Sequence, residues 1–96
     1  MASTADIPKY EEMIAAIGRF ISQVNEASSE MGVAGNECVE NCGNDNASTT
    51  SNAKLSECIS KFNESTETAG KVQAALQEQL EQLYELQRIE REIDSD

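Results

Sequence analysis

The chain has 96 residues, of which 39% are hydrophobic and 4% aromatic, with no tryptophan and no histidine. Its formal net charge is −11 at pH 7. This charge argues against a nucleic-acid-binding protein, which needs a basic face to displace phosphate counterions, and against docking on an anionic membrane. The length predicts a single domain, residues 1–96, and the small apolar fraction predicts that it lacks a wide globular core.

The first residues contain no continuous apolar segment of the kind that a signal peptide or a membrane span requires. Residues 1–6 are small and polar, and we expect them to fray. After them, Ile7, Met13 and Ile14 are interleaved with acidic residues and a lysine. We therefore expect a cytoplasmic protein, or one that is secreted without a cleaved signal peptide.

Residues 8–42 carry apolar side chains at steps of three and four, which predicts an amphipathic helix. Pro8 suits the first turn of this helix, because the N–H that proline lacks would have no partner there. The apolar positions are Tyr10, Met13, Ile14, Ile17, Phe20, Ile21, Val24, Ala27, Met31, Ala34, Cys38 and Cys42. Gly18, Gly32 and Gly35 weaken the helix; close packing of another helix is the favoured explanation for them, and a bend is the alternative.

Residues 43–48 contain the strongest turn signal, because Gly43, Asn44 and Asp45 follow one another directly. A second helix is predicted over residues 49–93. Its apolar positions are Leu55, Ile59, Phe62, Ala69, Val72, Leu76, Leu80, Leu83 and Ile93. Their spacing, close to alternating steps of three and four, indicates a seam of the coiled-coil kind.

Two long helices joined by a short turn pack as antiparallel neighbours. We predict an all-α fold, a helical hairpin of two long antiparallel helices. Folding the chain about residues 45–47 places Cys38 near Leu55 and Tyr10 near Leu83, and it leaves residues 84–96 without a partner in the same chain. Because two helices enclose no core, we further expect two hairpins to dimerise into a four-helix bundle.

The cysteines Cys38, Cys42 and Cys58 gather at the turn end of this hairpin. Three interpretations stay open: small buried hydrophobic residues in the seam, a disulfide from Cys58 to Cys38 or Cys42, and a metal site. The first is favoured. The metal site is favoured least, because structural zinc wants four Cys or His ligands, usually with tighter cysteine spacing, and the chain has three cysteines and no histidine.

The sequence lacks the motifs that catalysis and cofactor binding require. It has no histidine for general-base work, no glycine-rich phosphate loop and no serine in an elbow motif. Glutamate pairs such as Glu11–Glu12 and Glu78–Glu81 fall on the predicted solvent face. We therefore expect a protein that is not an enzyme, takes no cofactor or metal, and has proteins rather than nucleic acids or membranes as partners.

The most apolar surface of the C-terminal third is the one that we expect to bind a partner. The candidate residues are Leu76, Leu80, Leu83, Tyr84, Ile89 and Ile93. Helix faces of this kind either pack in a seam or dock on the helix of another protein, and both interpretations stay open.

In layout the chain resembles the small WXG-type proteins of type VII secretion. It shares their length, two long helices, acidic balance, helical C-terminal tail and a central turn that contains glycine, here Asn41-Cys42-Gly43. It departs from them because this turn has no tryptophan, and because Arg88 stands four residues after Tyr84, where the family's export signal has an acidic residue. The resemblance implies helical-hairpin dimers that are exported without a cleaved signal and act as partner, chaperone or effector.

The expected function is a non-enzymatic protein–protein interaction module, either a homodimer or a heterodimer with another helical hairpin. The resemblance implies a WXG-like small secreted protein, or a secretion partner or chaperone. One alternative is an acidic inhibitor of the phage type, which mimics nucleic acid and blocks a basic protein. Another is a structural or scaffolding helix pair in a larger assembly. The salt dependence of binding distinguishes the acidic inhibitor from the other two functions, because binding to a basic partner weakens steeply as the salt concentration rises.

Overall fold

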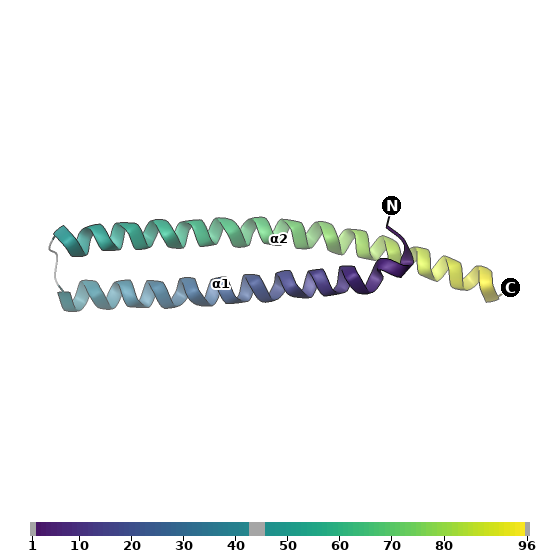
Figure 1. The fold of residues 1–96 in the computed structure, drawn as a ribbon, viewed down its shortest axis with the longest axis horizontal. Coiled ribbons are helices and arrows are strands. Elements are labelled where there is room, and N and C mark those ends of the chain that lie inside the picture. Colours follow the sequence, from purple (N-terminus) through teal and green to yellow (C-terminus); the bar gives the residue numbers. More distant parts are fainter. Residues whose placement is uncertain (1, 43–45, 96) are drawn as a thin grey trace. The chain divides into compact units, whose positions relative to one another are not determined.

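The computed structural model describes residues 2–42 and 46–95, and within them it confirms an all-helical hairpin (Figure 1). A short 3-10 helix, η1 (Thr4–Asp6), leads into α1 (Ile7–Cys42). The second helix, α2, spans Asn46–Ser95. The predicted bounds of the first helix are close to those observed. The second helix begins before and ends after its predicted bounds. It begins early because the small polar residues that follow Asn46 are accommodated in a first helical turn.

Part of the predicted turn over residues 43–48 is wrong, because residues 46–48 already belong to α2. Residues 43–45 lie outside the described residues, and so do the side chains of Cys42 and Ser48. The turn signal itself therefore falls on the part of the chain that the structure does not describe.

The hairpin divides into two compact units. The first, here called the terminal unit, joins Met1–Arg19 to Ala69–Asp96, and the second, here called the turn unit, is Phe20–Thr68. Each unit contains a stretch of α1 and a stretch of α2 that pack against each other. That residues 1–96 make one domain stays a prediction.

Most of the partly or fully buried residues of each helix fall on one row with alternating steps of three and four. On α1 they include Tyr10, Ile14, Ile17, Ile21, Val24, Ser28, Met31, Gly35 and Cys38. On α2 they include Asn52, Leu55, Ile59, Phe62, Thr66, Ala69, Gln73, Leu76, Leu80, Leu83 and Gln87. This is the seven-residue repeat of a coiled-coil seam, and we call these two sets the seam.

Several apolar residues that the sequence pattern assigned to the seam lie outside it. Met13 and Phe20 are 48% and 45% exposed, and Val72 and Ile93 are 48% and 67% exposed. Ser28, Thr66 and Gln73 occupy the seam positions instead. The prediction followed hydrophobicity, whereas a seam between two helices follows spacing and accepts polar residues where the repeat places them.

The terminal unit contains a small buried core. Ile7, Leu80 and Leu83 are 6%, 4% and 4% exposed, and Ala2, Tyr10 and Ile14 pack against them. This agrees with the expected proximity of Tyr10 and Leu83.

The N-terminal residues do not fray as we expected. The Ser3 N–H donates to Asp6 Oδ2 at 3.0 Å, and the Asp6 N–H donates to the Ser3 carbonyl at 2.9 Å. The Thr4 hydroxyl then donates to Glu90 Oε2 at 3.2 Å. The expectation that residues 84–96 have no partner in the chain is therefore wrong for residues 84–90, because the N-terminal segment accompanies α2 as far as Glu90.

In the turn unit, Leu55 lies against Gly35. A Cβ atom placed on Gly35 would come within 2.6 Å of Leu55 Cδ2, so only glycine leaves this side chain undisturbed. Gly35 stands one helical turn before Cys38, the residue that was expected beside Leu55. Close packing, rather than a bend, is thus the reason for this glycine.

Candidate interaction surface

A second row of residues runs along the outside of α2 in the terminal unit. Its members are Val72, Ala75, Gln79, Gln82, Leu86, Ile89 and Ile93, again at steps of three and four, and all are exposed. We call this row the outer stripe. Leu86 and Ile89 are 41% and 40% exposed, so the row presents large aliphatic side chains to solvent. An amphipathic helix with one apolar face does not require a second row, so this one needs a separate explanation.

The side of the hairpin on which the outer stripe lies follows from the seam. Tyr84 hydrogen-bonds with the Glu11 carboxylate, and each of these residues directly follows a seam residue on its own helix. They therefore mark one flank of the seam. Met13 and Val72 directly precede the seam residues Ile14 and Gln73, so they mark the opposite flank. Met13 thus widens the apolar surface of the outer stripe.

The six residues predicted to bind a partner fall into three places. Leu80 and Leu83 are buried in the core of the terminal unit and Leu76 is half-buried in the seam, so these three pack within the chain. Tyr84, 42% exposed, lies on the flank with Glu11. Only Ile89 and Ile93 belong to the outer stripe.

Sequence reasoning missed Val72 and Leu86 as members of an exposed surface. The signal that would have found them is a second series of three-four steps, offset from the first. It is visible only when the seam positions, polar ones included, are assigned first.

The hydroxyl of Tyr84 is held in its protonated form. Partial burial raises the pKa of Tyr84 above its ordinary value, and the hydrogen bond to Glu11 and the negative charge of that carboxylate raise it further. The Tyr84 hydroxyl donates this hydrogen bond and the Glu11 carboxylate accepts it. Its role at this position is to tie α2 to α1.

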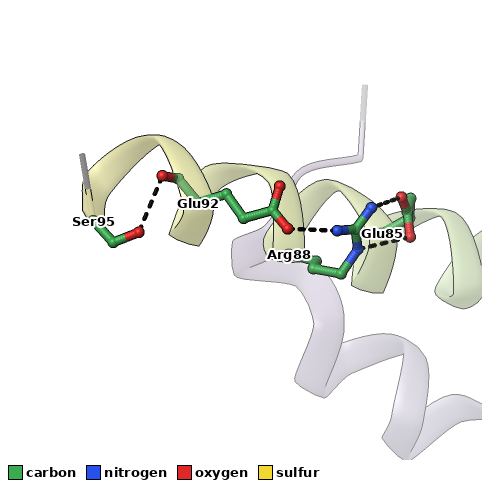
Figure 2. A network of polar contacts seen from close by, with 4 residues as sticks. All are labelled: Glu85, Arg88, Glu92 and Ser95. Atoms are coloured by element: carbon green, nitrogen blue, oxygen red, sulfur yellow. Dashed lines mark hydrogen bonds and ion pairs between the residues drawn. The ribbon is translucent and has the colours of Figure 1, made fainter.

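A polar network holds the C-terminal end of α2 (Figure 2). Arg88 Nη2 donates to Glu85 Oε1 at 2.5 Å, Arg88 Nη1 donates to Glu92 Oε1 at 2.6 Å, and the Ser95 hydroxyl donates to the Glu92 carbonyl at 3.1 Å. The hydrogen bond and the charge of Arg88 lower the pKa of Glu85. These pairs, three and four residues apart, support the last turns of α2.

The turn unit carries a different feature, a hollow of about 270 Å³ beside Gly32 and Gly35. Its lining is completed by Asn36, Val39, Asn52, Leu55, Ser56 and Ile59. A Cβ atom added to Gly32 would meet nothing within 4 Å, so the hollow exists partly because this residue has no side chain. The mixed polar and apolar lining offers no arrangement that points to a particular ligand.

Cys38 and Cys58 are free thiols in the structure, and both are half-buried. The side chain of Cys42 lies outside the described residues. Half-burial suits small hydrophobic residues at a helix contact. A disulfide from Cys58 to Cys38 or Cys42 stays a prediction.

No group of three or more His, Cys, Asp or Glu side chains in residues 2–42 and 46–95 is arranged to hold a metal ion. Within the same ranges, neither helix combines the length and the apolar character that crossing a membrane requires.

Compared with known protein families, with curated proteins and with solved structures, the chain matches none of them.

Proposed function

We propose that the protein is a non-enzymatic protein–protein interaction module. In this proposal it acts as a WXG-like small secreted protein of a type VII secretion system, or as the secretion partner or chaperone of one. It works as a dimer, with a second copy or with another helical hairpin, in which four helices share a core.

The outer stripe is the observation that carries the proposal. Two helices bury only the side chains between them. Large aliphatic residues in a row on the outside contribute a favourable hydrophobic free energy only when another surface covers them. Leu86, Ile89 and Ile93 form this row close to the end of α2, where recognition of a partner is expected.

The small size of the buried core supports the same proposal. Among the described residues, the buried hydrophobic side chains are Ile7, Leu80 and Leu83, all in the terminal unit. Small domains with so little burial generally need oligomerisation or a covalent staple. A partner that covers the outer stripe supplies additional burial next to this core.

The test is secretion from a bacterium that carries a type VII system, measured beside the same strain without the system's ATPase. We expect the chain in the medium of the first strain alone, and we expect the double variant Leu86→Gln/Ile89→Gln to stay in the cells. The double variant Val33→Gln/Val39→Gln is the matched control, because it makes two exposed aliphatic residues of the turn unit polar. Equal secretion from both strains, or secretion of the outer-stripe variant at the level of the native chain, contradicts the proposal.

A further inference from the structure

The contact between Gly35 and Leu55 shows which residues of the turn unit stand level with each other. A Cβ atom on Gly35 would lie 2.6 Å from Leu55 Cδ2 and 3.6 Å from Asn52 Oδ1. Because the two helices are antiparallel, each step forward along α1 corresponds to a step back along α2. Cys38, three residues after Gly35, therefore stands level with Asn52, three residues before Leu55. We call this arrangement the first register.

The first register keeps two thiols of the turn unit apart. Cys58 lies six residues beyond Asn52, a distance of about 9 Å along the helix axis at about 1.5 Å per residue. The Cα atoms of a disulfide are at most about 7 Å apart. Cys38 and Cys58 are free and half-buried in the structure, in agreement with this separation. A bridge between them is incompatible with the first register.

A shift of one seven-residue repeat removes the separation. Seam positions recur every seven residues, so when α2 slides by one repeat toward the turn, each seam residue meets another seam residue. Cys38 then stands level with Ile59, and Cys58 directly precedes Ile59. Cys58 takes the place that Ser51, seven residues earlier, holds in the first register. We call this arrangement the second register.

We infer that a disulfide between Cys38 and Cys58 switches the hairpin from the first register to the second. The two thiols lose two protons and two electrons as the sulfur–sulfur bond forms. The oxidant is an exchanging disulfide such as oxidised glutathione, whose own sulfur–sulfur bond breaks to give two thiols. This inference goes beyond the proposed function and does not depend on it.

The start of α2 is suited to the change of register. Sliding α2 by seven residues moves the midpoint of the chain reversal by half as much, into the segment that begins at Asn46. Residues 46–52 are Asn, Ser and Thr apart from Ala47. Side chains of these three types compete for backbone hydrogen bonds and lower the stability of a helix. The first turns of α2 can therefore become the new turn at a small cost in free energy.

The same shift changes the contacts of the terminal unit, because α1 and α2 each continue through both units. Leu83 leaves Ile7 and stands level with Ile14, so an aliphatic pair is kept. Gln73 loses the Ile14 carbonyl, to which its amide donates at 3.0 Å in the first register. The redox state of the turn unit is thereby coupled to a hydrogen bond of the terminal unit.

The first experiment measures the disulfide equilibrium of the full chain with Cys42→Ser, in mixtures of reduced and oxidised glutathione. Peptide mapping without reduction identifies the bridge between Cys38 and Cys58. Gln73→Ala removes a contact of the first register, so the equilibrium constant for bridge formation should rise by about fivefold. Gln77→Ala, at an exposed position of the same helix, is the control and should leave the constant unchanged.

A second pair of cysteines tests the same coupling without a shift. In Cys58→Ser/Ser51→Cys, again with Cys42→Ser, the introduced thiol is already level with Cys38 in the first register. We expect this bridge to form at a lower ratio of oxidised to reduced glutathione. Gln73→Ala should not change its equilibrium constant, because the reduced and oxidised chains then share one register.

Nuclear Overhauser effects of an isotope-labelled chain with Cys42→Ser show the register directly. In the reduced chain, the Gly35 Hα protons should give cross-peaks to the Leu55 methyl groups. In the oxidised chain these cross-peaks should be replaced by cross-peaks to the ring of Phe62, which stands level with Gly35 in the second register. Dithiothreitol should restore the original cross-peaks.

Three results would overturn the inference. The first is that no bridge forms between Cys38 and Cys58 within one chain. The second is an oxidised chain that keeps the cross-peaks between Gly35 and Leu55. The third is a bridge whose equilibrium constant does not respond to Gln73→Ala, because the disulfide then forms by local opening of the turn unit alone.

Discussion

The terminal unit and the turn unit have the same two-helix plan but differ in what fills the seam. The terminal unit places Leu80 and Leu83 at successive seam positions against Ile7, and its polar seam residue Gln73 donates to the Ile14 carbonyl at 3.0 Å. The turn unit places Ser28 in the seam, where its hydroxyl is buried without a hydrogen-bond partner. Gly35, also in the seam, contributes no side chain to bury. The same spacing thus gives a stabilised pair of helices in one unit and a weakly packed pair in the other.

The difference assigns separate roles to the two units. The terminal unit combines the buried core with the exposed outer stripe, so the apolar row lies on the helix that also contributes Leu80 and Leu83 to the core. The turn unit has a weaker seam and a hollow beside Gly32, which are properties of the part of a protein that opens first. Three pairs of substitutions test this comparison, and a fourth prediction concerns the C-terminal end of α2.

The largest effect is expected from Leu80→Ala, which removes a nearly fully buried side chain from the core. The free energy of unfolding should fall by about 2 to 4 kcal/mol, since the helices cannot close the cavity completely. Leu55→Ala is the matched control in the turn unit, where half-burial predicts a loss of about 1 kcal/mol. Urea unfolding followed by circular dichroism measures both, and equal losses would contradict the difference between the units.

The glycines of the turn unit should respond to alanine in opposite directions. Gly35→Ala forces Leu55 to move and should reduce the free energy of unfolding by about 1 to 2 kcal/mol. Gly32→Ala meets open space and should raise it by up to about 1 kcal/mol, because alanine favours the helix. Thermal unfolding of the two single variants decides, and a shift in the same direction for both would argue against the close approach at Gly35.

Polar seam residues should likewise differ between the units. Ser28→Ala removes a buried hydroxyl that has no partner and should stabilise the chain by about 0.5 to 1 kcal/mol. Gln73→Ala removes a satisfied amide and should destabilise it by about 1 kcal/mol. Chemical denaturation of both variants is the measurement. A Gln73→Ala variant more stable than the native chain would mean that this hydrogen bond does not contribute to the free energy of unfolding.

The smallest effect concerns pH. Because Arg88 lowers the pKa of Glu85, this pair stabilises the helix above the ordinary pKa of a glutamate, and the effect is lost as pH falls through the lowered pKa. Both side chains are exposed, so the loss is confined to fraying of residues 85–95. Amide hydrogen exchange of this segment, corrected for the intrinsic pH dependence of exchange, should show it. Arg88→Gln should abolish the effect, and Arg91→Gln, which removes the same charge nearby, should keep it.

Much of the fold could be predicted, because helix formation depends on local spacing. Three-four steps predicted both helices. The N-terminal segment was mispredicted because Thr4 is fixed by Glu90, a contact far apart in sequence. The overhang was overestimated for the same reason.

The candidate site was predicted only in part. Ile89 and Ile93 were identified as exposed apolar residues of the C-terminal third, and they belong to the outer stripe. Leu80 and Leu83 were grouped with them, although they are buried against Ile7. Hydrophobicity does not distinguish a leucine in the seam from one on the flank, since the two differ only by a rotation about the helix axis.

The sequence by itself determined two amphipathic helices, their antiparallel order and the acidic surface, since these depend on neighbours along the chain and on composition. Only the tertiary structure decided the register, which sets Leu55 against Gly35 and the Tyr84 hydroxyl against Glu11. Register fixes the rotation of each helix about its axis. That rotation buries Ser28 and Gln73 in the seam and leaves Val72, Leu86, Ile89 and Ile93 on the outside of α2.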